Sequence, residues 1–167
     1  MSDAPTLVTL TQPLSPATEA YRTLRMNILF ADQDQPVRSL LVVAASAAGG
    51  DWATQTLANL AVTMAQIEQR VIVVDSNFRE PCLHDIFGLP NDAGLTTMMT
   101  GQDPVAHPPL NQTAVPGLRL LTSGPLPALA PDLLGSRRMD QVLDVLQSEA
   151  DIILLSAPPL LTVTDAA

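Results

Sequence analysis

The stretch SLLVVAASAAGGDWAT, residues 39–54, decides the fold. It opens with the apolar run Ser39–Ala45, passes through small residues and glycines, and leads into a helical pattern over residues 54–68. A buried strand is therefore expected to run through a tight loop into a helix. Loops of this composition build phosphate cradles, because their backbone N–H groups and the following helix N-terminus point at an anion.

Three further apolar runs resemble the first, since each is rich in Leu, Val and Ile without alternating with polar residues. They cover residues 70–75, 118–121 and 151–155. Such runs are typical of strands that are buried on both faces of a parallel sheet. Helical periodicity is found over residues 16–30, 54–68 and 136–149, with shorter helices expected near 82–87 and 94–100. This alternation predicts a three-layer α/β domain with right-handed crossovers.

Composition narrows the possible functions. The 167 residues, 47% hydrophobic and 15% charged, suit a single globular domain. Eight arginines, no lysine and 17 acidic residues give a net charge of −9, which disfavours a nucleic-acid binder or a polybasic membrane anchor. The single cysteine, Cys82, excludes an intrachain disulfide and a cysteine zinc cluster. No run approaches the roughly 18 apolar residues of a membrane span, so a cytoplasmic protein is expected.

Three strand ends carry the candidate chemistry, because ligands of open parallel sheets bind at the carboxyl ends of the strands. These segments cover residues 46–54, 75–81 and 156–159. Together with Glu19-x-x-Arg22-x-x-Arg25, they resemble the P-loop domain of bacterial tyrosine kinases (BY-kinases). BY-kinase domains are the cytoplasmic ATPase modules of capsule and exopolysaccharide chain-length regulators, and are related to the MinD/ParA ATPases.

The resemblance runs from about Ser15 to the last residue and includes Arg79-x-Pro81, Gly94-Leu95 and Pro158-Pro159. It implies a P-loop NTPase-like α/β domain with a mostly parallel sheet, shortened at its C-terminal end. The expected organisation is an N-terminal tail over residues 1–14 and one domain over residues 15–167.

The first motif departs from the family pattern. Where BY-kinases have Gly-Glu-Gly-Lys-Ser/Thr, this chain has Gly50-Asp51-Trp52-Ala53-Thr54. Trp52 replaces a glycine and is expected to fill the phosphate space, whereas Ala53 replaces the lysine that partners the β- and γ-phosphates. Asp51 is interpreted as a helix N-cap rather than a catalytic group.

The two acidic motifs of the family also have fewer acidic residues in this chain. The family's Asp-x-Asp-x-Arg reads Asp75-Ser76-Asn77-Phe78-Arg79, and its Asp-Ser-Pro-Pro begins with Ser156. Thr54 and Asp75 remain as possible magnesium-side groups, and no catalytic residue and no metal site are predicted. The degenerate nucleotide-binding set, if any nucleotide binds, comprises Gly49, Gly50, Asp51, Trp52, Ala53, Thr54, Asp75, Asn77, Arg79 and Ser156.

Several hypotheses follow from the resemblance and these losses. The first is a catalytically inactive BY-kinase-like regulator or scaffold in exopolysaccharide, capsule or lipopolysaccharide biosynthesis, acting through protein contacts. The alternatives are a nucleotide-binding switch without hydrolysis, and an active protein-tyrosine kinase or ATPase completed in trans. No cofactor is expected, except Mg-ADP or Mg-ATP if the degenerate site still binds.

Self-association and a membrane polysaccharide chain-length regulator are the expected partners. Glu19, Arg22 and Arg25 form either an oligomer contact, as in the family, or a solvated helix face with an intrahelical ion pair. For Arg79, two roles are considered: an ion pair with Asp75 or Glu80, and a residual phosphate contact.

Overall fold

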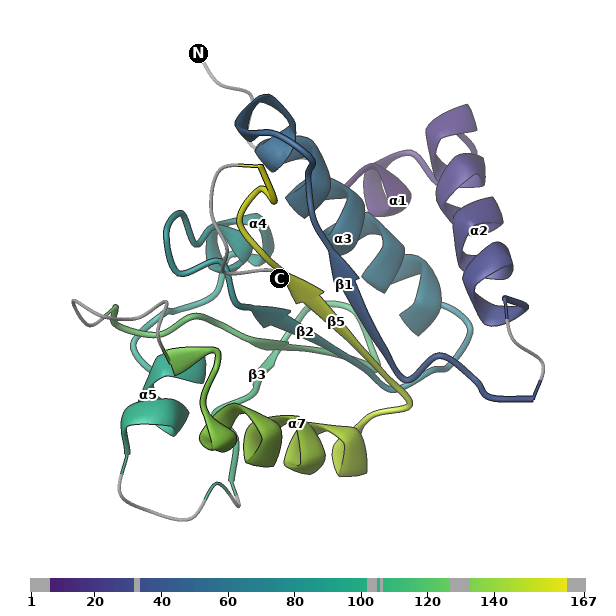
Figure 1. The fold of residues 1–167 in the computed structure, drawn as a ribbon. Coiled ribbons are helices and arrows are strands. Elements are labelled where there is room, and N and C mark those ends of the chain that lie inside the picture. The colour runs from purple at the N-terminus through teal and green to yellow at the C-terminus, as the bar shows by residue number, and fades with distance from the viewer. Residues whose placement is uncertain (1–6, 32–33, 102–104, 106, 127–132, 162–167) are drawn as a thin grey trace.

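The computed structural model describes residues 7–31, 34–101, 105, 107–126 and 133–161, with only the backbone of Ala47, Gly50 and Asp51. Its centre is a five-stranded sheet in the order β1-β5-β2-β4-β3 (Figure 1). The strands are β1 (Ser39–Val42), β2 (Val71–Asp75), β3 (Asn111–Gln112), β4 (Leu118–Leu121) and β5 (Ile152–Ser156). The first four in spatial order are parallel, and β3 pairs antiparallel with β4 at one edge.

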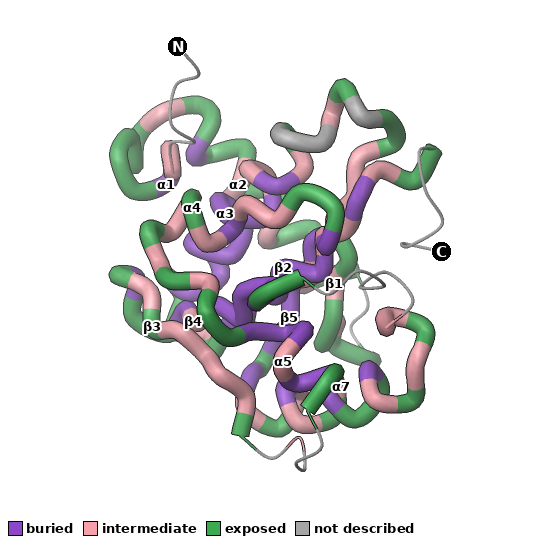
Figure 2. The backbone as a smooth tube through the Cα atoms, turned by 90° about the vertical axis from the view of Figure 1, so that its left-hand side faces the viewer, coloured by how far each residue is buried: buried purple, intermediate pink, exposed green. Residues whose placement is uncertain are grey.

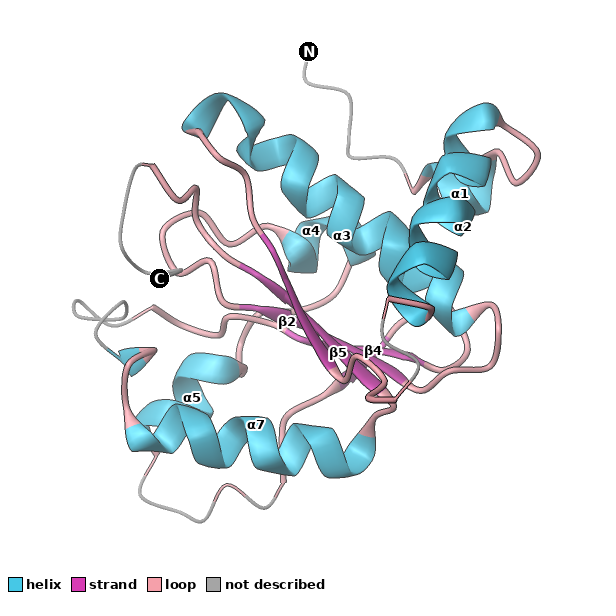
Figure 3. Cartoon of the chain, turned by 45° about the vertical axis from the view of Figure 1, so that its right-hand side comes forward, coloured by secondary structure: helices cyan, strands magenta, loops and turns pink. Residues whose placement is uncertain are grey.

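Helices cover both faces of the sheet (Figure 3). The helices are α1 (Val8–Thr11), α2 (Pro16–Leu29), α3 (Gly50–Ala65), α4 (Leu83–Phe87), α5 (Leu95–Thr100) and α7 (Arg137–Glu149), with a 3-10 turn η1 (Ala47–Gly49) before α3. One face carries α3 and α4, with α1 and α2 packed outside α3, and the other face carries α5 and α7. The result is a three-layer α/β domain, as the alternation of strand and helix patterns predicted.

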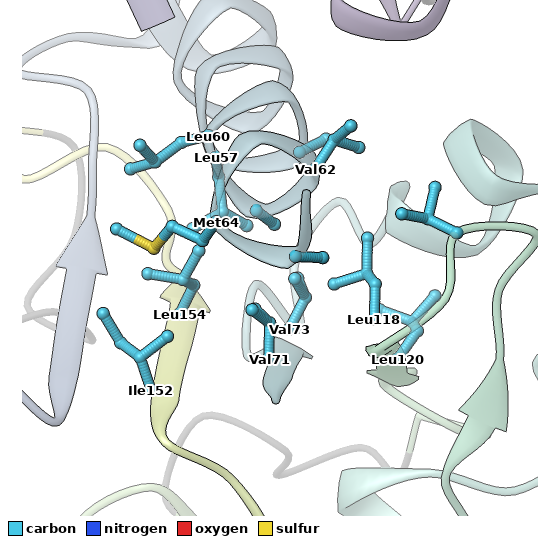
Figure 4. Close-up of a cluster of buried hydrophobic side chains, with 14 of the residues drawn as sticks. Leu57, Leu60, Val62, Met64, Val71, Val73, Leu118, Leu120, Ile152 and Leu154 are labelled. Carbon is cyan, nitrogen blue, oxygen red and sulfur yellow. The ribbon is translucent and has the colours of Figure 1, made fainter. Parts of the chain in front are cut away.

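The core divides between the two faces because successive strand residues point to opposite sides of the sheet. Val71, Val73 and Leu154 pack with α3, including Leu57 and Met64 (Figure 4). The alternate strand residues Ile72, Val74 and Ile153 pack with α5 and α7. Figure 2 shows the resulting buried centre, and β2 is buried at all five positions. This burial on both faces explains why the strand sequences do not alternate with polar residues.

The four apolar runs and the five helical segments are confirmed, with small shifts of their bounds. Ser15 caps α2 by accepting a hydrogen bond from the backbone N–H of Thr18 at 3.2 Å. The N-cap prediction for Asp51 is wrong: α3 begins at Gly50, and its N-cap is Gly49, two residues before Asp51 and without a side-chain cap. A glycine can take this place because the loop tightens into a 3-10 turn before the helix.

The segment expected as a tail contains α1 from Val8 onward. Thr9 is fully buried there, and its backbone N–H and hydroxyl donate to Asn59 Oδ1 at 3.1 and 2.9 Å. The division at residue 15 stays a prediction. In the part of the chain that is described, no helix is long and apolar enough to cross a membrane.

Candidate functional site

The carboxyl ends of three neighbouring strands meet at one edge of the sheet. β5 lies between β1 and β2, and its last residue, Ser156, pairs in register with Val42 on one side and Asp75 on the other. The structure therefore brings together Asp75, Ser156 and the loop that begins α3, as expected for an open parallel sheet.

Asp75 is the acidic centre of this site, and both of its carboxylate oxygens are engaged. Oδ2 accepts the backbone N–H groups of Cys82 and Leu83 at 3.1 and 3.0 Å, at the start of α4. Oδ1 accepts the Ser156 hydroxyl at 3.0 Å and the Asn77 backbone N–H at 3.3 Å. The side chain thus ties β2 to β5 and to the first turn of α4, whose N-terminal N–H groups have no intrahelical partner.

Burial sets the protonation tendency of Asp75. The residue is 1% exposed, and the loss of hydration raises the pKa of its carboxyl above the usual value. The hydrogen bonds from Leu83, Ser156, Asn77 and Cys82 act in the opposite direction without outweighing burial. Next to it, the Ser76 hydroxyl donates to the Ser156 carbonyl, which adds a second link between the two strands.

Asn77 has a local structural role. Its side-chain oxygen accepts the backbone N–H groups of Arg79 and Glu80, both at 3.3 Å, and its amide donates to the Glu80 carbonyl at 3.1 Å. These bonds form the turn that leads from β2 toward α4, a role in which asparagine is favoured. Arg79 lies on the exposed side of this turn.

The first motif lies at the start of α3. Trp52 is 72% exposed, and its filling of the phosphate space stays a prediction. Its side chain lines an open hollow of about 420 Å³ together with Gly49, Ala53, Thr56 and residues 42–46. Thr54 is 9% exposed within α3. The side chain of Asp51 and the surroundings of Gly50 lie outside the described residues.

The charged residues of α2 divide between two roles. Arg22 forms an ion pair with Glu19 one turn away, on the solvent side of the helix. Arg25 turns inward, and its Nη1 donates to the Thr63 carbonyl of α3 at 2.7 Å. That contact joins α2 to the last turn of α3, where free carbonyls favour a cation. The prediction of an oligomer contact at these three residues remains a prediction.

The residues at the strand ends fit a magnesium nucleotide poorly. The chain has no lysine, Asp75 has both oxygens engaged within the fold, and Ser156 is neutral. Among the described residues, no group of three His, Cys, Asp or Glu side chains could hold a metal ion. A lysine, the usual partner of the β- and γ-phosphates, is therefore not supplied by this chain.

Sequence reasoning located Asp75 but missed two of its partners. The Cys82 and Leu83 N–H groups belong to a helix of five residues, and nothing in the spacing of residues 75–83 signals that its first turn folds back onto the strand end. The link from Arg25 to the Thr63 carbonyl was also missed, because a backbone acceptor leaves no trace in the sequence.

The fold is that of the P-loop NTPases related to MinD. MinD from Pyrococcus horikoshii in complex with Mg-ADP has 20% sequence identity and a TM-score of 0.58, with 74% of this chain and 49% of that chain covered. The chimerical protein CapA2B2 is more similar, with 35% identity, a TM-score of 0.84, and coverage of 96% and 69%.

Sequence comparisons give the family. CapB of Staphylococcus aureus, named as a tyrosine-protein kinase, is 33% identical over 155 residues, or 93% of this chain and 67% of CapB. The tyrosine-protein kinase YwqD of Bacillus subtilis is 34% identical over 160 residues, or 96% of this chain and 66% of YwqD. No family model matches the sequence. The chain belongs to the bacterial tyrosine kinase family, and it spans about two thirds of the length of these two relatives.

Proposed function

We propose that this chain is a catalytically inactive member of the bacterial tyrosine kinase family that works through protein contacts. The observation that carries the proposal is the state of Asp75, the acidic residue that remains at the strand ends. Its two oxygens accept four hydrogen bonds from the chain itself. A carboxylate committed to that extent is a structural acceptor, and binding a metal would require breaking contacts that hold α4 in place.

The neighbouring positions support the same conclusion. Ala53 stands where the family resemblance places the phosphate-binding lysine, and Ser156 where it places an acidic residue. Phosphoryl-transfer enzymes act almost entirely by positioning and electrostatic stabilisation, so these losses remove most of what catalysis requires. In the proposed role the protein is a cytoplasmic regulator or scaffold in polysaccharide biosynthesis, associated with itself or with a membrane chain-length regulator.

The direct test is a sensitive ATPase and autophosphorylation assay in the presence of magnesium. We expect turnover no higher than that of buffer, and the same result for Thr54→Ala. Magnesium-dependent turnover that is lost in Thr54→Ala would refute the proposal, because that variant removes a remaining magnesium-side group without touching Asp75.

A second candidate is a nucleotide-binding switch without hydrolysis. It is favoured by the position of Trp52, which is 72% exposed and lines the open hollow at the start of α3. Trp52 is the only tryptophan, so its emission reports on this loop directly. A saturable change with Mg-ADP or Mg-ATP at micromolar to low-millimolar concentration, confirmed by calorimetry, would place the switch ahead of the inactive scaffold.

A further inference from the structure

The helices α1 and α2 form one arm of the molecule, residues 7–31, which lies outside α3 (Figure 1, Figure 3). The hydroxyl of Thr18 on α2 is fully buried and donates to two carbonyls of the α1 segment, those of Gln12 at 2.8 Å and Val8 at 3.3 Å. A helix of four residues is too short to be stable by itself, so α1 depends on this link. We therefore expect α1 and α2 to move together.

The contact between this arm and α3 is polar at its centre. Thr9 and Asn59, which are joined by the two hydrogen bonds described above, are 0% and 2% exposed. Thr63, whose carbonyl accepts a hydrogen bond from Arg25 Nη1, is also fully buried. Polar contacts of this kind are typical of surfaces between parts of a chain that move relative to one another.

Apolar packing contributes little to the docking of the arm. The fully buried apolar residues of the described core cluster around α3 all lie outside residues 7–31, and the arm adds the partly buried Leu7 and Ile28. By contrast, α7 has 13 residues and buries Met139, Val142 and Leu146. Because the hydrophobic effect scales with the apolar area removed from water, α7 is held more firmly than the arm.

Arg25 adds a cost to the docked arrangement. Its Nη1 donates to the Thr63 carbonyl at 2.7 Å, but its Nε is buried and finds no acceptor among the described residues. An unpaired buried donor has lost its hydration without compensation. When the arm leaves α3, this N–H returns to water, so undocking removes a cost that the docked state carries.

The sheet does not depend on the arm, because its ladders pair the strands β1 to β5 with one another and include no residue of α1 or α2. We propose that the α1–α2 arm undocks from α3 as one unit while the sheet, α3 and α7 stay folded. Arg25 then alternates between the Thr63 carbonyl and solvent.

This device goes beyond the proposed function and is independent of whether the strand ends bind nucleotide. Its consequence concerns protein contacts, because the residues predicted to form an oligomer contact, Glu19, Arg22 and Arg25, all lie on the arm. Docking on α3 keeps Arg25 inside the molecule, whereas undocking offers it to a partner together with the other two.

Hydrogen exchange of the native protein, followed by mass spectrometry at urea concentrations below the unfolding transition, tests the proposal. We expect the amides of α1 and α2 to exchange at least about tenfold faster than those of α7 and β2. Their exchange should also depend less on urea, because undocking exposes less surface than unfolding of the whole domain.

Three variants separate undocking from global unfolding. Arg25→Ala should accelerate exchange in α1 and α2 by the same factor, about fivefold, whereas the matched control Arg22→Ala should change it less than about twofold. Val142→Ala destabilises α7 and should accelerate exchange in α7 and β2 about tenfold or more. It should leave the arm within about twofold, because α7 stays folded in the undocked state. Met139→Ala makes the same comparison if Val142→Ala does not fold.

Two results would overturn the proposal. If Val142→Ala accelerates exchange in the arm as much as in α7, the arm opens only when the whole domain unfolds. If Arg25→Ala accelerates exchange in α2 but not in α1, the two helices open separately. The exchange experiments contain no nucleotide, so their outcome is distinct from that of the ATPase assay, which tests the strand ends.

Discussion

Replacing Asp75 by alanine tests whether its carboxylate stabilises the fold or serves a ligand. In the fold, the carboxylate accepts the N–H groups of Cys82 and Leu83. Hydrogen bonds to a charged group contribute about 1.5–3 kcal/mol each, so these two alone are worth about 3–6 kcal/mol. The loss is partly offset, because the variant no longer has to bury a charged group. We therefore expect Asp75→Ala to lower the free energy of unfolding by about 3 kcal/mol at pH 7.

Urea unfolding followed by far-UV circular dichroism measures this change. With an m-value of about 2 kcal/mol/M, a loss of about 3 kcal/mol moves the midpoint down by about 1.5 M urea. The same loss lowers the melting temperature by about 6–12 °C in a domain of this size. The matched control is Asp144→Ala on the exposed side of α7, which should stay within about 0.5 kcal/mol of the native protein.

The result that refutes this reasoning is a loss below about 1 kcal/mol with an unchanged m-value. Such a result would mean that the Cys82 and Leu83 N–H groups find other partners, and that Asp75 is available to a ligand. An m-value that changes instead would indicate an altered denatured state or an unfolding intermediate, and the midpoint alone could not be interpreted.

Three further predictions use the same measurement. Because burial raises the folded-state pKa of Asp75, the contribution of this residue to the free energy of unfolding is full below the unfolded-state pKa and falls as the pH rises through the folded-state pKa. Asp75→Ala should therefore lower the free energy of unfolding more at pH 3 than at pH 7. A larger loss at pH 7 would contradict the direction of the pKa shift. Ser156→Asp, which introduces the residue type that the family resemblance implies, should lower the free energy of unfolding by about 2 kcal/mol or more at pH 7 and by less at acidic pH, because it sets two carboxylates side by side in a buried site. An unchanged midpoint would show that the site can hold both charges. Arg25→Ala should lower the free energy of unfolding by about 1 kcal/mol, because it removes the hydrogen bond to the Thr63 carbonyl. Arg22→Ala breaks an exposed ion pair and should lower it by less than about 0.5 kcal/mol. Equal losses in the two variants would contradict the contact of Arg25 with α3.

The layers of the fold could be predicted because their signals are local. The continuous apolar run of β2 requires burial on both faces, and the 3.6-residue stripe of α7 requires one buried side. The antiparallel pairing of β3 could not be predicted, because two residues carry no periodicity. The burial of Thr9 was equally hidden, since it depends on Asn59, which lies 50 positions along the chain.

The position of the candidate site was predicted, but the hydrogen bonds that its side chains form were not. The order of the strands places Asp75 beside Ser156. Both lie at the carboxyl ends of parallel strands, where ligands of open sheets bind. Which hydrogen bonds a carboxylate accepts depends on how the next connection folds back, and here Leu83 of that connection is buried in the same core cluster as residues of α3 and β2. The exposure of Trp52 follows from the helix start, because α3 begins at Gly50 and the tryptophan lies on its exposed side.

The changes at the strand ends depend on one another. A serine at position 156 can donate a hydrogen bond to Asp75, which an aspartate in its ionised form cannot do. Asp75 in turn is free to serve as the acceptor for the first turn of α4 only as long as no cation claims its oxygens. The serine at position 156 and the commitment of Asp75 to hydrogen bonds within the fold therefore stabilise each other. A lysine introduced at position 53 would leave these bonds intact, so in the proposed inactive protein Ala53→Lys alone is not expected to create ATPase activity.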